Sequence, residues 1–157
     1  MGLDNRPLCP SARPDTAGAV LFGVVGGGPD DDGLVAYLRQ PQPATADVLA
    51  LAGPLPPTAV FRFAAPCATS ACVHFDGDDC RLATRIVDLL PPVVHVLPPC
   101  PVRSGCRWWR QEGRAACMRC PGIATDPADG SEALRRAADP STGGQPGATP
   151  PGRGSAG

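Results

Sequence analysis

The chain has 157 residues, carries a formal net charge of −1, and contains 43% hydrophobic but only 4% aromatic residues. This length predicts a single domain with a small core, and the near-neutral charge gives no indication of a nucleic-acid or membrane partner. The chain has no apolar run of about 18 residues and no signal-peptide core, so no membrane span is expected and the cytoplasm is the expected compartment.

The strands are predicted mainly in the first half of the chain. Residues 1–17 contain three prolines and are expected to be irregular. Apolar runs at 19–25 and 34–38 predict two strands joined into a hairpin by a glycine-rich turn. Prolines are expected to break the chain over residues 40–43. Residues 59–63 alternate in the manner of a third strand.

The helices are predicted from capping residues and from apolar spacing. Thr45 is expected to cap a short helix over residues 46–52. Apolar residues recur at helical spacing over 81–90, and a pair of prolines ends that segment. Residues 107–118 are also predicted to be helical, although Gly113 weakens the pattern.

These elements predict a small irregular α+β domain over residues 1–125. The part over 1–66 is expected to hold the short sheet, and the part over 67–125 is expected to form a cysteine-rich half that binds a metal or cluster. Residues 126–157 are rich in proline and glycine and are predicted to be a disordered tail, with one or two helical turns at 131–138.

Eight cysteines are the main chemical signal in the sequence. Seven of them lie within the second half, and the eighth stands alone near the start. In a reducing cytoplasm, clustered cysteines are metal ligands or redox centres more often than disulfides. The expected metal ligands are Cys9, Cys67, Cys72, Cys80, Cys100, Cys106, Cys117 and Cys120.

Four thiolates can hold one zinc ion or one [4Fe–4S] cluster, so eight cysteines allow two complete sites. Cys100, Cys106, Cys117 and Cys120 are close in sequence and are expected to form one site. Cys67, Cys72 and Cys80 then need a fourth ligand, for which Cys9 and His74 are the two candidates. Partitions that mix the two sets stay open.

Iron–sulfur clusters are favoured over zinc by three Cys-Pro steps, a feature of ferredoxin-type ligand runs. The complete ferredoxin run is absent, however, and the chain has one C-x2-C pair where a zinc ribbon has two. One or two [4Fe–4S] clusters are therefore the expected cofactors, with Zn²⁺ as the alternative.

The residues around Cys106 are expected to contact the cofactor. Trp108 and Trp109 can shield a cluster from water, although adjacent tryptophans on a helix point in different directions, so one is expected in the core and the other partly exposed. Arg107 belongs to an arginine-rich stretch, from Arg103 to Arg119, that can offset anionic sulfur or dock an acidic partner. The alternative is a solvated helix face.

The function predicted from these features is electron transfer to or from a redox partner protein. A zinc-stabilised interaction module and a cluster-based redox sensor are the alternatives. An enzyme is less expected, because no nucleophile–base pair is evident and no catalytic residue is assigned.

Overall fold

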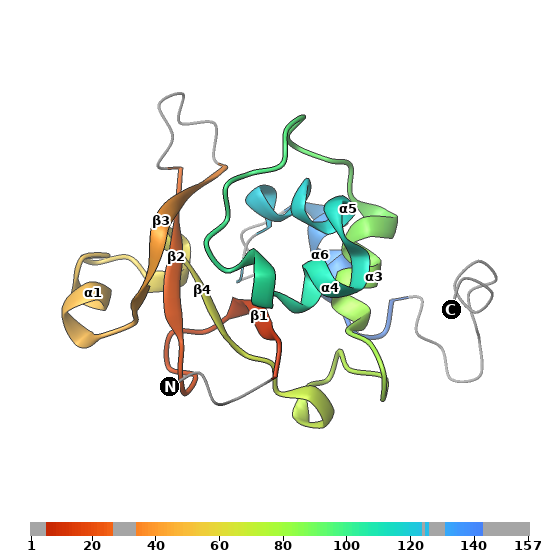
Figure 1. The fold of residues 1–157 in the computed structure, drawn as a ribbon, viewed down its shortest axis with the longest axis horizontal. Coiled ribbons are helices and arrows are strands. Elements are labelled where there is room, and N and C mark those ends of the chain that lie inside the picture. The colour runs from red at the N-terminus through yellow and green to blue at the C-terminus, as the bar shows by residue number, and fades with distance from the viewer. Residues whose placement is uncertain (1–5, 27–33, 124, 126–130, 143–157) are drawn as a thin grey trace.

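The structure is a computed structural model that describes residues 6–26, 34–123, 125 and 131–142. It has the predicted α+β architecture, in which one antiparallel sheet is accompanied by several short helices (Figure 1). The four strands pair in the order β1-β4-β2-β3, so β1 and β3 are the edge strands. The strands are β1 (Leu8–Ala12), β2 (Val20–Val25), β3 (Val35–Pro43) and β4 (Phe61–Pro66).

The predicted hairpin is confirmed, because β2 and β3 pair antiparallel from Val25 opposite Val35 to Val20 opposite Pro43. Two predictions about prolines were wrong. Residues 40–43 continue β3, and the segment around Pro10 forms β1. Proline cannot donate a backbone hydrogen bond because it lacks the N–H. An edge strand has a neighbouring strand on one side only, so a proline there does not have to break the pairing.

The helices follow the capping and spacing signals. Thr45 accepts a hydrogen bond from the Val48 N–H at 3.3 Å and caps α1 as predicted. The helix predicted over 107–118 is divided at Gly113, whose φ is +65°. Within the described residues, no helix is long and apolar enough to cross a membrane. The helices are α1 (Ala46–Ala50), α2 (Pro57–Val60), α3 (Arg81–Leu89), α4 (Arg107–Glu112), α5 (Arg114–Cys117) and α6 (Glu132–Ala138), with 3-10 turns at Thr69–Ala71, Arg103–Gly105 and Cys120–Gly122.

The sheet separates two apolar clusters, because successive strand residues point to opposite faces. Phe61 and Phe63 pack with α1 on one face. Phe22 and Ala64 lie on the other face, against Val102 from the cysteine-rich half. Figure 1 accordingly shows α1 on one side of the sheet and α3 to α6 on the other.

Helix α6 packs on the cysteine-rich half and extends the domain beyond the predicted boundary at residue 125. Leu134 and Ala137 are buried in the same apolar cluster as Ile86 and Trp108. Arg85 Nε also donates to the Ala137 carbonyl oxygen at 2.6 Å. The helical turns predicted at 131–138 are therefore present and packed, because the two apolar residues lie three positions apart on one helix face. The rest of the predicted disordered tail, 126–130 and 143–157, lies outside the described residues.

Candidate metal centres

The eight cysteines fall into two spatial groups, and all eight are free thiols. Cys9 from β1 lies near three cysteines that follow β4. Burial is the main cause that raises the pKa of the Cys9 thiol to about 12, and the neighbouring thiols of Cys80, Cys67 and Cys72 raise it further. We call these four residues the first cysteine group.

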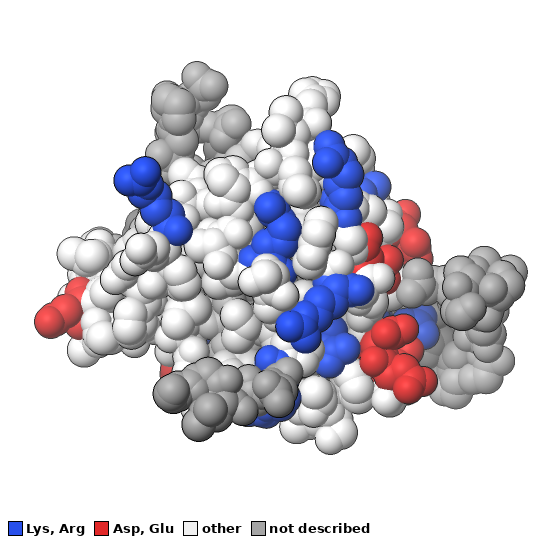
Figure 2. Space-filling model, viewed as in Figure 1, with Lys and Arg blue, Asp and Glu red and all other residues white. Residues whose placement is uncertain are grey.

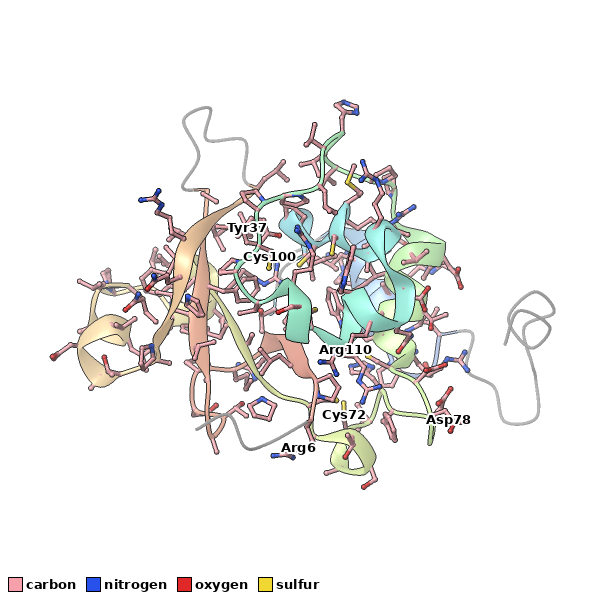
Figure 3. The ribbon with its side chains drawn as sticks, in the orientation of Figure 1. Arg6, Tyr37, Cys72, Asp78, Cys100 and Arg110 are labelled. Atoms are coloured by element: carbon pink, nitrogen blue, oxygen red, sulfur yellow. The ribbon has the colours of Figure 1, made fainter. Side chains whose placement is uncertain are left out.

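The remaining four cysteines line one cavity. This second cysteine group consists of Cys100, Cys106, Cys117 and Cys120. The cavity lies between the sheet and helices α4 and α5 and is partly open to solvent. Figure 3 shows Cys100 beside Tyr37 at this place, and Cys72 of the first group nearer to Arg6. The other lining residues are Pro10, Phe22, Tyr37, Pro98, Arg103, Trp108 and Ala116.

Backbone N–H groups point at most of the sulfurs. Thr69 N donates to Cys67 Sγ at 3.4 Å, and His74 N donates to Cys72 Sγ at the same distance. Backbone N–H groups of the residues that follow Cys9, Cys80, Cys100 and Cys106 partly oppose the effect of burial, which raises the pKa of these thiols. Donors of this kind stabilise a sulfur that carries negative charge.

Two cysteines also cap helices. Cys80 directly precedes α3 and Cys106 directly precedes α4, and backbone N–H groups of each following turn partly oppose the effect of burial on the pKa of the thiol. Helix α4 also holds Cys80 through Gln111, whose Oε1 accepts from the Cys80 N–H at 2.8 Å and whose Nε2 donates to the Cys80 carbonyl oxygen at 2.9 Å. The helix that starts in the second group therefore fixes a member of the first.

Burial nevertheless works against ionised thiols in the protein without metal. It raises the pKa of Cys106 to about 12 and that of Cys100 to about 11. Metal ligation requires the thiolate, so a bound centre has to displace these protons and supply positive charge in their place.

Arg62 is a fully buried guanidinium beside the second group. Its Nη2 lies 3.4 Å from Cys120 Sγ, and its Nη1 donates to the Cys120 carbonyl oxygen at 2.8 Å. Burial opposes the charge, but the Cys120 sulfur, Tyr37 and Cys9 raise the pKa of Arg62 above its ordinary value. A buried cation requires an anionic partner, and among the described residues the groups that raise this pKa are two sulfurs and a phenol.

Two further side chains donate to sulfurs of the second group. The Tyr37 hydroxyl bonds to Cys120, and burial together with this sulfur raises the pKa of Tyr37. Arg103 bonds to Cys117 and partly offsets the effect of burial on the Cys117 thiol, whose pKa is still raised. The second group is therefore surrounded by both charged and neutral donors.

His74 is arranged as a structural residue rather than as a ligand. Arg85 Nη2 lies 2.7 Å from His74 Nδ1. Because a guanidinium can only donate, Nδ1 accepts and the neutral ring carries its proton on Nε2. Burial and the Arg85 charge also lower the pKa of His74, which keeps the ring neutral. Cys9 is thus the better fourth partner for Cys67, Cys72 and Cys80.

The residues predicted to contact a cofactor lie in different places. Trp108 is buried and lines the cavity, whereas Trp109 is half-buried and carries Arg103 over its ring at 5.5 Å. The expected division between one core and one partly exposed tryptophan is confirmed. Arg107 lies over the Phe75 ring at 5.4 Å and is not part of the cavity lining.

The two groups are neighbours across one short segment. Cys9 belongs to the first group, and Pro10 lines the cavity of the second. Leu8 also forms a β-bridge to Cys106, which joins the start of β1 to the second group. The start of β1 therefore contacts both cysteine groups.

Sequence reasoning missed Arg62, Tyr37 and Gln111. The strand alternation does place Arg62 on the face opposite Phe61 and Phe63, but an arginine in that position is normally expected to face solvent. Only the cysteine-rich half, folded over that face, makes it interior. The feature of the sequence that could have indicated this is a single arginine, Arg62, inside an otherwise apolar strand.

Among the described residues, no three His, Cys, Asp or Glu side chains are placed to hold a single metal ion. Comparisons of the chain with protein-family models, with curated proteins and with solved structures found no match.

Proposed function

We propose that the protein is a small iron–sulfur protein that holds two [4Fe–4S] clusters and transfers electrons to or from a partner protein. The first cysteine group would hold one cluster and the second group the other. When bound, such clusters supply reversible one-electron chemistry.

The cavity between the four cysteines of the second group is the observation that carries this proposal. Zinc draws four sulfurs to about 2.3 Å from one point. In a [4Fe–4S] cluster each thiolate binds a different iron, so the four sulfurs stand around a volume. Four cysteines spread around the wall of one cavity fit the second arrangement better.

The surroundings of the sulfurs also support an anionic cofactor. Backbone N–H groups donate to the sulfurs of Cys67 and Cys72 in the first group, and Arg62 supplies a buried positive charge at Cys120 in the second. Buried Trp108 closes part of the cavity wall. Hydrogen bonds to sulfur and exclusion of water are the means by which a protein stabilises and tunes such clusters.

An arginine-rich surface lies beside the second group and suits an acidic partner. Cys100 and Cys117 are half-buried, so this group comes close to solvent. Figure 2 shows arginines across the middle of this face, with acidic residues toward its edges. Opposite charge on a partner would speed docking and orient it. The arginines are Arg103, Arg107 and Arg119, which are half-buried, and Arg110 and Arg114, which are exposed.

The proposal is tested by the optical response of protein purified without oxygen. We expect a brown protein with a broad band at about 400 nm that bleaches with dithionite and returns on reoxidation. A colourless protein that contains stoichiometric zinc would contradict the proposal and would favour a zinc-stabilised interaction module.

A further inference from the structure

Arg62 and Tyr37 are the two side chains of the sheet that reach a sulfur of the second cysteine group. Arg62 comes from β4 and Tyr37 from β3, and both meet Cys120. Neither belongs to the cysteine-rich half, and neither is a candidate metal ligand. Their position raises the question of what they do for a bound centre.

Arg62 is held in one position by several acceptors. Its Nη1 donates to the carbonyl oxygens of Cys120 at 2.8 Å and Ile123 at 3.0 Å. Its Nη2 donates to the Pro10 carbonyl oxygen at 2.7 Å and lies 3.4 Å from Cys120 Sγ. The guanidinium also lies over the Phe22 ring at 5.4 Å. A planar group fixed on several sides keeps its charge at a constant distance from the sulfur.

Tyr37 is fixed by the same phenylalanine. Its ring stacks on Phe22 with centroids 5.9 Å apart, and its hydroxyl bonds to the Cys120 sulfur. Phe22 is fully buried, so the ring that supports both side chains cannot shift without opening the core. Cys120 therefore receives a positive charge and a hydroxyl donor from one rigid unit of the sheet.

Positive charge and hydrogen bonds to a ligating sulfur stabilise the reduced form of a cluster, because reduction adds negative charge at the metal and its thiolates. The effect is strong in a site shielded from water. Arg62 meets this condition, since its side chain has no exposed surface.

We propose that Arg62 and Tyr37 raise the reduction potential of the centre held by the second cysteine group, by acting on the Cys120 sulfur. This inference rests on the proposed function and goes further by assigning two residues that tune one of the two centres. They are positioning residues and not ligands. Reduction here takes one electron from an external one-electron donor such as dithionite, and no bond forms or breaks.

The test is a potentiometric titration of the second centre alone. A Cys67→Ser background removes a ligand of the first group and leaves the second group intact. Tyr37→Phe, Arg62→Lys and Arg62→Met are then compared in that background. Exposed Arg39, on the same strand as Tyr37, provides the control variant Arg39→Met.

We expect the midpoint potential to become more negative in Tyr37→Phe and more negative still in Arg62→Met. Arg62→Lys keeps the charge and is expected to shift less, and Arg39→Met is expected to match the parent. If Arg62 had a purely structural role, its replacement would lower the stability of the protein but would not produce this order of midpoint potentials. If Arg62→Met does not fold, Tyr37→Phe, which loses one hydroxyl, decides the matter.

Parent-like potentials in both Tyr37→Phe and Arg62→Met, with a reducible centre present, would overturn this inference and leave the proposed function standing. A wild-type protein without iron and sulfide would overturn both. The two failures are distinguished by metal analysis before any titration.

Discussion

At the scale of single residues, two kinds of hydrogen-bond donor contact the sulfurs, namely backbone N–H groups and side chains. The backbone donors to Cys67 and Cys72 come from the residue two positions later, so local chain geometry supplies them. Arg62 lies 58 positions from Cys120 in sequence, so only the complete fold brings it to the sulfur. The cysteines could therefore be identified from the sequence, whereas the side chains that surround them could not.

Cys9 and His74 give a direct test at this scale, because both were candidates for the fourth position of the first group. Cys9→Ser is expected to lose about half of the bound iron, as the loss of one of two four-cysteine sites requires. His74→Ala is expected to keep its iron, because the His74 ring already binds Arg85 through Nδ1. Iron content measured on both variants decides between them.

The reverse pattern, with iron lost in His74→Ala and kept in Cys9→Ser, would make His74 the ligand. A matched variant is Cys67→Ser, which is expected to behave as Cys9→Ser does because both belong to the same group.

At the scale of elements, the sequence was informative wherever one local rule decided the outcome. The apolar spacing that predicted a helix at 81–90 corresponds to α3, and Thr45 caps α1. The rule that proline ends a strand failed at β1 and β3, because the strand order that makes them edges is not visible in local sequence. Which strands pair with one another depends on contacts between residues far apart in the sequence.

Gly113 is the element boundary with the clearest physical requirement. It joins α4 to α5 with φ +65° and ψ −144°, a conformation open essentially to glycine alone. Gly113→Ala is expected to destabilise the protein by about 1–3 kcal/mol. Cys117 lies at the end of α5, so loss of iron from the second group is expected to accompany this change.

Gly105→Ala provides the matched control for that prediction. A Cβ at Gly105 would meet Leu8 at 3.7 Å, which is ordinary contact, and its φ is not in the left-handed region. Thermal unfolding of the two variants should therefore differ, with Gly113→Ala melting at the lower temperature. Equal melting temperatures would show that the α4–α5 junction adapts to a side chain.

At the scale of the whole molecule, the sheet forms a wall beside both cysteine groups. Cys9 on β1 faces the first group, while Pro10 and Tyr37 face the second. Gln111 of α4 ties Cys80 to the helix that begins at Cys106. The division of the cysteines followed from their spacing, but their placement against a shared sheet depends on strand order and so was not predicted.

The central claim is that each cysteine group holds its own [4Fe–4S] cluster. The most direct measurement is the iron, sulfide and zinc content of anaerobically purified wild-type protein beside Cys67→Ser and Cys120→Ser. We expect about eight iron and eight sulfide per wild-type chain and about four of each in either variant. Stoichiometric zinc without sulfide, or iron and sulfide at wild-type levels in both variants, would contradict the claim.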